Sequence, residues 1–229
     1  MIVAVVGGKG GVGKSTVALN LARELDVPVV DADLSAPDLP HGAGPDVREV
    51  LAGHADPVDA IEQHGTVRVL SCGRTLSGSR VADLSALGEV LNRLAREFSR
   101  VVVDCPAGLA RDVGRILHCA DVAVLVTTPS RPALLDAFRT RRLGLDLGTR
   151  PVATVLNRST NGDGERLADR VEATFETPVT VVEERAAIDE ARRAGTPIRD
   201  VAPNAAAEPF AAVARTIDRC GQRSATGNR

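Results

Sequence analysis

The sequence contains no tryptophan, no tyrosine and only four phenylalanines. Valine, leucine, isoleucine and alanine must therefore fill the core of a chain that is 44% hydrophobic. The shortage also removes the aromatic platforms on which many proteins stack nucleic acid bases. The net charge of −2 gives no overall attraction toward nucleic acid or anionic lipid. Nonspecific DNA binding through the arginine clusters stays possible, but these observations do not favour it.

The four cysteines form no C-x-x-C pair, and a chain of 229 residues can bury a core without disulfide bonds. We expect reduced thiols, and the four histidines show no zinc-ligand spacing. No hydrophobic run approaches the roughly 18 residues of a membrane span, and the apolar start carries no basic leader. The sequence therefore predicts a cytoplasmic protein. Membrane recruitment is doubtful, because the apolar stripe near the C-terminus is typical of core packing; its members are Phe210, Val213, Ala214 and Ile217.

Lysine is nearly absent as well. Lys9 and Lys14 lie in one glycine-rich loop, and every other basic residue is arginine. A compact ammonium group cannot be replaced freely by a planar guanidinium, so we expect the chemistry in this loop. Apolar residues at 2–6 predict a strand before the loop, and apolar spacing over 15–25 predicts a helix after it. Residues 8–15 match G-x-x-x-x-G-K-[ST], the pattern of a phosphate-binding loop.

This pattern predicts a role for each residue of the loop. Glycines let successive backbone N–H groups face inward and hold phosphates at a helix N-terminus. Lys14 is expected to contact the β- and γ-phosphates of ATP, and the Ser15 hydroxyl is expected to ligate Mg²⁺. The predicted nucleotide contacts of the loop are Gly8, Lys9, Gly10, Gly11, Val12, Gly13, Lys14, Ser15 and Thr16.

Apolar strands alternate with helical segments along the chain, which predicts an α/β fold with a mostly parallel sheet covered by helices on both faces. Strands are expected at 2–6, 28–31, 67–71, 100–104, 121–127, 151–156 and 178–182. Helices are expected at 15–25, 46–52, 83–98, 110–118, 131–143, 164–175, 185–194 and 208–219. We expect one domain over residues 1–220, and a polar disordered tail over 221–229.

Acidic residues follow two of the predicted strands, at the edge of the sheet where ligands bind in such folds. Asp31, Asp33 and Asp104 are candidates to hold Mg²⁺ together with Ser15, and one acid could orient the attacking water. Each could alternatively cap a turn or a helix. Gly108 would let the backbone approach the γ-phosphate, because it has no Cβ.

The predicted strand at 151–156 is followed by Asn157 and Arg158. An amide offers both a donor and an acceptor, so Asn157 could read the adenine edge, although it could equally be a turn residue. The N-K-x-D pattern of guanine recognition is absent. We expect the segment containing Glu183 to close over the base.

The loop K-G-G-V-G-K-S-T resembles the deviant Walker A motif of the MinD/ParA ATPases. D-A-D at 31–33 and D-C-P-A-G at 104–108 resemble the two switch segments of that family. The resemblance covers most of residues 1–200, and over 47–78 it is closer to MinD than to ParA. It implies an ATP-dependent homodimer in which Lys9 crosses the interface to the partner's nucleotide. It also implies that Lys9, Lys14 and Asp33 are the catalytic residues. The sequence departs from the family at Val182, where proline is frequent.

The biological role stays open at this point. The resemblance to MinD implies a switch that positions a division site, a chromosome or a polar machine, with an unknown activator and cargo. D-A-D-L-S-A-P-D-L-P also resembles Mrp-type iron–sulfur carriers, but their downstream C-x-x-C is missing. A ParA-like DNA-partitioning ATPase, a P-loop ligase or synthase, and a scaffold that binds ATP without turnover are further alternatives.

Overall fold

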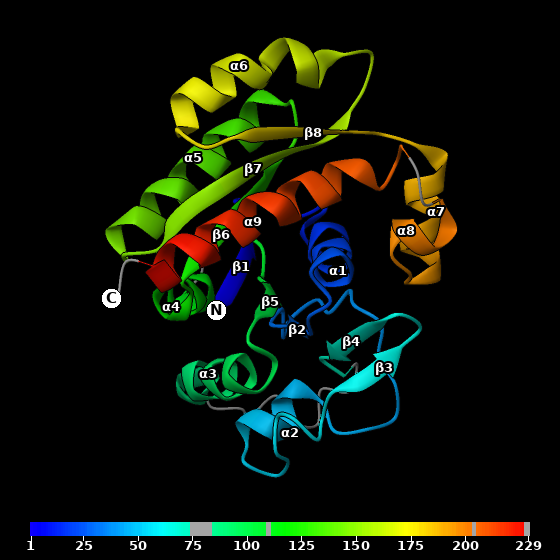
Figure 1. Cartoon of the computed structure of the whole chain (residues 1–229), viewed down its shortest axis with the longest axis vertical. Helices are drawn as coiled ribbons and strands as arrows, with labels where there is room; N and C mark the ends of the chain where they lie inside the picture. Colours follow the sequence, from blue (N-terminus) through cyan, green and yellow to red (C-terminus); the bar gives the residue numbers. More distant parts are fainter. Residues whose placement is uncertain (74–83, 109–110, 203–204, 227–229) are drawn as a thin grey trace.

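The computed structural model describes residues 1–73, 84–108, 111–202 and 205–226. Within them, eight strands form one sheet in the order β3-β4-β2-β5-β1-β6-β7-β8 (Figure 1). Their bounds are β1 Ile2–Val6, β2 Val29–Asp31, β3 Glu62–His64, β4 Val67–Leu70, β5 Val101–Asp104, β6 Val122–Thr127, β7 Arg150–Ser159 and β8 Val179–Glu183. All neighbouring strands are parallel except β3 and β4. The predicted fold class is confirmed.

The helices of the described residues are α1 Lys14–Leu25, α2 Val47–Leu51, α3 Leu87–Phe98, α4 Arg111–Cys119, α5 Arg131–Asp146, α6 Asp163–Phe175, α7 Ala186–Ala194, α8 Ile198–Val201 and α9 Glu208–Thr226. Each predicted helix has a counterpart among them, although α3 begins later and α9 ends later than predicted, and one short helix is added. A 3₁₀ turn, η2, spans Leu84–Ala86. Some predicted positions lie outside the described residues: 74–78 of the MinD-like segment, 83, 110 and 227–229.

Two elements escape prediction from the sequence, and both have a physical reason. β3 consists of three polar residues at the edge of the sheet, so no alternation of apolar and polar residues marks it. α8 has four residues and lies too close to α7 for a separate apolar period to be visible. Both elements are held by tertiary contacts and not by strong local preference.

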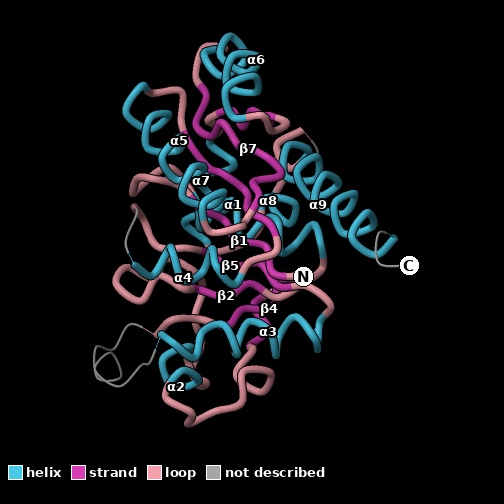
Figure 2. The backbone as a smooth tube through the Cα atoms, turned by 90° about the vertical axis from the view of Figure 1, so that its left-hand side faces the viewer, coloured by secondary structure: helices cyan, strands magenta, loops and turns pink. Residues whose placement is uncertain are grey.

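The sheet has a hydrophobic core on each face, because successive side chains of a strand point to opposite sides. Val3 and Val5 pack with α1 and α9, whereas Ile2, Ala4 and Val6 pack with α3 and α4 on the other side. Figure 2 shows α9 on one side of the strands and α4 and α5 on the other. The glycine-rich loop, Asp31 and Asp104 lie at the carboxyl ends of β1, β2 and β5, the edge where ligands bind in such sheets.

The C-terminal helix differs from the predicted tail. α9 continues to Thr226, so residues 221–226 are helical where the sequence predicts disorder. Extending a helix adds one hydrogen bond for each residue that is ordered, so a helix that the core has already ordered can continue into a polar segment. The apolar stripe of α9 is buried, as expected for core packing; its members are Phe210, Val213, Ala214 and Ile217. In the described part of the chain, no helix is both long and apolar enough to cross a bilayer.

Candidate nucleotide-binding site

The glycine-rich loop connects β1 to α1 in the geometry that a phosphate-binding loop requires. Gly11 and Gly13 have φ angles of +79° and +97°, which side chains rarely adopt. A Cβ on Gly8 would lie 2.5 Å from the backbone of Asp136 in α5. The loop is therefore packed closely against α5. Lys14, the first residue of α1, is 8% exposed.

The second lysine of the loop has a different environment. Lys9 is exposed, and it forms no hydrogen bond or ion pair with any other residue that the structure describes. Gly10 and Gly11 beside it are also exposed. The loop thus keeps one ammonium group inside the site, at Lys14, and presents the other on the surface.

The sheet brings the predicted acids together. β2 pairs with β5, and Asp31 lies directly opposite Asp104 in the register. Asp31 is fully buried and Asp104 is 1% exposed. Burial raises the pKa of Asp104 from 3.8 to about 7, although the Ser15 hydroxyl and the Lys14 ammonium oppose the rise. Burial, followed by the charge of Asp104, raises the pKa of Asp31 well above its ordinary value.

The two acids of the D-A-D segment hold the loop that follows β2. Asp31 accepts hydrogen bonds from the backbone N–H groups of Asp33 and Leu39, at 3.1 and 3.3 Å. Asp33 is less buried, and its Oδ1 accepts from the backbone N–H of Ser35 at 3.1 Å and from its hydroxyl at 2.7 Å. The same oxygen accepts from the backbone N–H of Ala36 at 3.0 Å. Both oxygens of Asp31 are therefore occupied, whereas only Oδ1 of Asp33 takes part in these bonds.

Asp104 and Ser15 are the best placed pair for Mg²⁺. Oδ1 of Asp104 is buried and has no hydrogen-bond partner among the described residues. A bound cation would satisfy this oxygen and lower the cost of burying its charge. Within the described residues, no three His, Cys, Asp or Glu side chains gather into a metal cluster. Mg²⁺ does not need one, because it commonly binds one or two protein ligands together with water and phosphate oxygens.

The predicted base contacts lie together beside α7. Asn157, Arg158 and Glu183 line one small pocket with Thr16 and the start of α7. Asn157 is 5% exposed, and its Nδ2 donates to the carbonyl of Val12 at 2.8 Å. Asn157 thus braces the phosphate-binding loop, which the sequence does not predict. A Cβ on Gly13 would lie 2.2 Å from that nitrogen.

The structure also places the other residues that the sequence assigns to the base and to the γ-phosphate. Glu183 forms an ion pair with Arg185 at 2.5 Å at the end of β8. Val182, where the sequence departs from the family pattern, is buried in the core and lines neither of the pockets beside α7. Gly108 has a φ of +85°, and a Cβ there would meet nothing within 4 Å. The positive φ is the reason that glycine suits this position.

A larger cleft of about 370 Å³ extends from the phosphate-binding loop along α1. Its walls include residues that the sequence does not assign to a nucleotide site: Asn20 on α1, Asp38 after β2, and Arg192 on α7. Asn20 does carry a signal in retrospect, because it is the one polar residue in the apolar run from Val17 to Ala22. No local pattern places Asp38 or Arg192 at a nucleotide site, since only the fold brings them to the cleft.

A glycine-rich loop between a central parallel strand and a helix, with a buried acid on the neighbouring strand, defines a P-loop NTPase. The family model described as ParA, NUBPL iron-transfer P-loop NTPase, matches residues 1–162. The chain belongs to the MinD/ParA family of P-loop NTPases.

Three relatives illustrate the range of this family. The chain is 36% identical over 192 residues to an uncharacterised ATP-binding protein of Methanocaldococcus jannaschii, covering 79% of this chain and 73% of that protein. It is 28% identical over 210 residues to an iron–sulfur cluster carrier protein of Pyrococcus horikoshii, covering 76% and 71%. The septum site-determining protein MinD of Pyrococcus horikoshii, solved with Mg-ADP, superposes with a TM-score of 0.87 at 28% identity and 96% coverage of both chains.

Proposed function

We propose that this protein is a MinD-like ATPase that binds ATP with Mg²⁺, dimerises around two nucleotides and hydrolyses ATP to ADP and phosphate. One observation carries the proposal: a single loop holds a buried Lys14 and an exposed Lys9 without a partner in the described chain. A buried lysine at the helix start suits the bound triphosphate. An exposed lysine in the same loop suits a phosphate bound by a second subunit.

The residues of the site divide the work of hydrolysis. Lys14 and the backbone N–H groups of the loop bind the phosphates and stabilise the charge that develops on them. Asp33 is less buried than Asp31 and Asp104, and its carboxylate orients the attacking water. Asp104 and Ser15 would hold Mg²⁺, which neutralises phosphate charge when it is bound. Asp31 keeps the loop after β2 in place through its two backbone hydrogen bonds.

The dimer would act as a switch that controls the position of a partner in the cell. Gly108 lies in the segment after β5, where contact with the γ-phosphate would be lost on hydrolysis. The structure of MinD from Pyrococcus horikoshii was solved with Mg-ADP, and its similar fold supports the binding of a nucleotide with Mg²⁺ by this protein. We place the protein in the cytoplasm. The switch would act with an activating protein and a cargo, which could recruit it transiently to a membrane or a cell pole.

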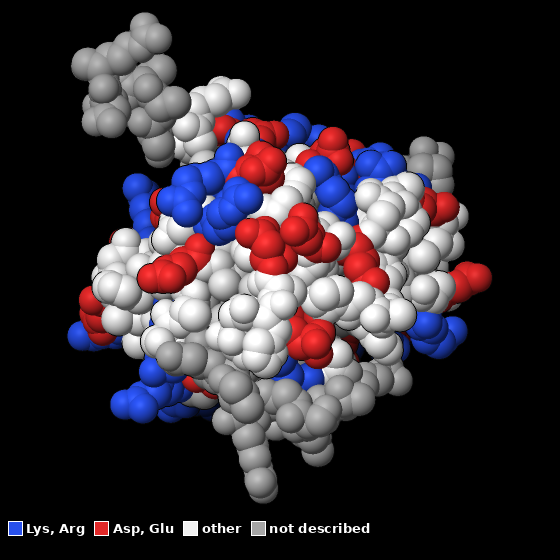
Figure 3. All heavy atoms as spheres, turned by 90° about the horizontal axis from the view of Figure 1, so that it is seen from below, with Lys and Arg blue, Asp and Glu red and all other residues white. Residues whose placement is uncertain are grey.

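Nonspecific DNA binding receives little support from the surface. On the face that Figure 3 shows, Lys and Arg side chains lie among Asp and Glu side chains. Several exposed arginines are paired with acids, for example Arg139 with Asp136 at 2.9 Å and Arg192 with Asp189 at 3.6 Å. Binding to a DNA backbone depends on unpaired cations that can release counterions. We therefore prefer a protein as the partner of the switch.

Replacing Lys9 by alanine tests the dimer. We expect Lys9→Ala to bind ATP with nearly the affinity of the original protein, because Lys14 and the loop backbone remain. We expect it to stay monomeric with Mg-ATP, because the contact to the second nucleotide is lost. Light scattering after gel filtration measures the mass with ATP and with ADP. Arg170→Ala removes an exposed cation from α6 and should leave the ATP-dependent dimer intact. A Lys9→Ala dimer equal to that of Arg170→Ala would contradict the proposal.

An iron–sulfur carrier is the second candidate, since one relative bears that name and the matching family model is described as iron-transfer. The thiols of this chain do not favour it. Cys72 and Cys105 are buried, and burial raises the pKa of Cys72 to about 12. Anaerobic reconstitution with iron and sulfide, followed by visible absorbance, separates the candidates. A stable cluster would support the carrier, and a colourless protein that releases phosphate from ATP would support the switch.

A further inference from the structure

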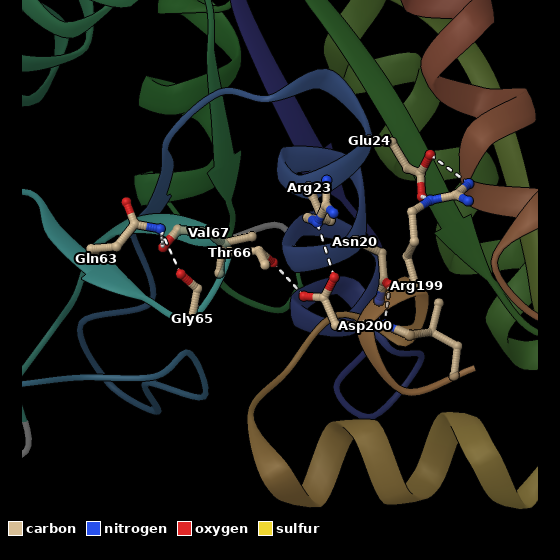
Figure 4. Close-up of polar contacts among 10 residues, drawn as sticks. Asn20, Arg23, Glu24, Gln63, Gly65, Thr66, Val67, Arg199 and Asp200 are labelled. Carbon is tan, nitrogen blue, oxygen red and sulfur yellow. Dashed lines mark hydrogen bonds and ion pairs between the residues drawn. The ribbon is translucent and has the colours of Figure 1, made fainter. Parts of the chain in front are cut away.

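The short helix α8 lies across the side of α1, far along the sequence from it. Figure 4 shows side chains from one face of α1 reaching toward α8. Arg23 contacts Asp200 at 3.1 Å, and Glu24 accepts from Arg199 at 2.8 Å. Asp200 also accepts a hydrogen bond from Thr66, in the turn between β3 and β4. The contacts of Asp200 with Arg23 and Thr66 are exposed, so each contributes little to stability, whereas the Glu24 carboxylate is 10% exposed and accepts two hydrogen bonds from Arg199.

One contact between the two helices is buried. Asn20 is 3% exposed, and its Oδ1 accepts from the backbone N–H of Ile198 at 2.8 Å. Its Nδ2 donates to the carbonyl of Thr16 at 2.7 Å, one turn earlier in α1. The amide thus satisfies the first N–H of α8, and Ile198 itself is fully buried. Leaving such a buried N–H without an acceptor is costly, so Asn20 holds α8 in one position on α1.

This position matters because the segment before α8 forms a wall of the nucleotide cleft. Ile188 and Arg192 of α7 line both the cleft and the small pocket beside Asn157. Thr196 and Ile198 continue the same wall of the cleft. A helix of four residues cannot maintain itself in water, so its place depends on what it is attached to. Asn20 therefore connects the helix that binds phosphate to the wall beside the base.

We propose that Asn20 is a positioning residue for the nucleotide base: it sets the distance between the phosphate-binding helix α1 and the α7–α8 wall, and so contributes affinity only to ligands that carry a base. The proposal rests on the proposed function, since it assumes that the cleft binds ATP. Within the described residues, the Asn20 amide hydrogen-bonds to the carbonyl of Thr16 and to the N–H of Ile198. We therefore expect its loss to affect the base side of the cleft more than the phosphate side.

The test compares ATP with inorganic tripolyphosphate, which has the phosphates without the base. Isothermal titration with Mg²⁺ measures both ligands on the original protein and on Asn20→Ala. We expect Asn20→Ala to lower the affinity for ATP by about tenfold or more. We expect tripolyphosphate to bind both proteins with affinities within about twofold, because the phosphate-binding loop is unchanged. Arg23→Ala is the matched control on the same helix, and its partly exposed contact should leave both affinities nearly unchanged.

The possible failures are separable. Equal weakening of ATP binding and tripolyphosphate binding would overturn the inference, because Asn20 would then act through the phosphate-binding helix. An unchanged affinity for ATP would overturn it as well. Failure of the original protein to bind either ligand would instead remove the proposed function. If Asn20→Ala does not fold, amide hydrogen exchange measured on the original protein tests the inference instead. ATP should slow exchange at the Ile198 amide more than tripolyphosphate does, and equal slowing would overturn the inference.

Discussion

Replacing Asp104 by asparagine is expected to stabilise the nucleotide-free protein and to abolish its Mg²⁺-dependent ATP hydrolysis. The folded protein raises the pKa of Asp104 from 3.8 to about 7, so it retains a proton that the unfolded chain releases. Stability is therefore lost as the pH rises from about 4 to about 7, and the full loss persists above that range. This pKa difference corresponds to a loss on the order of 4 kcal/mol, which an uncharged amide avoids.

Urea unfolding of the nucleotide-free proteins at about pH 5 and about pH 8 measures this effect. The advantage of Asp104→Asn over the original protein should be about two to three times larger at the higher pH. Phosphate release with Mg-ATP should fall to background, because the amide supplies no charge to hold Mg²⁺ beside Ser15. Asp169→Asn changes an exposed acid on α6 and should alter neither quantity. A variant that gains no stability at high pH would show that the buried carboxylate carries no such cost.

Replacing Asp33 by asparagine is expected to lower the rate of ATP hydrolysis by about 100-fold or more while nucleotide binding persists. The amide oxygen of asparagine can still accept the hydrogen bonds from Ser35 and Ala36, so the loop after β2 keeps its turn. What is lost is the negative charge and the basic oxygen that orient the water. Single-turnover phosphate release, measured beside ATP affinity, separates chemistry from binding.

The state of the dimer provides the second measurement for Asp33. If hydrolysis ends the dimer, Asp33→Asn should remain dimeric with Mg-ATP long after the original protein has returned to monomers. Ser35→Ala is the matched control, because it removes one of the turn's hydrogen bonds and leaves the carboxylate in place. Near-normal phosphate release by Asp33→Asn would exclude Asp33 as the residue that orients the water. It would leave ATP binding and the Lys9 contact untouched as proposals.

Much of the fold could be predicted because its signals are local. The strand at 2–6 and the helix after the glycine-rich loop follow from short apolar periods and from the motif between them. β3 and α8 could not be predicted, since each is too short to show a period and depends on contacts with distant segments. The C-terminal tail fails for a related reason, because α9 extends from a stripe that the core orders.

The candidate site divides in the same way. The residues proposed to bind phosphate are contiguous, so their spacing alone is enough to predict them. Asp31 and Asp104 each end a strand, but their direct opposition requires β2 to pair with β5, which no local pattern encodes. The brace from Asn157 to Val12 and the hydrogen bond from Ile198 to Asn20 join segments that are far apart in the chain. Such contacts depend on strand order and helix placement.

The amino-acid sequence by itself determined the glycine-rich loop motif, the alternation of strands and helices, and the predicted class of ligand, because glycine conformation, hydrophobic period and lysine chemistry act over a few residues. Only the tertiary structure decided that Asp31 lies opposite Asp104, that α8 is hydrogen-bonded to α1, and that Lys9 is the exposed lysine. These properties arise from burial and from the distance between atoms of remote segments, and both quantities exist only once the chain has folded.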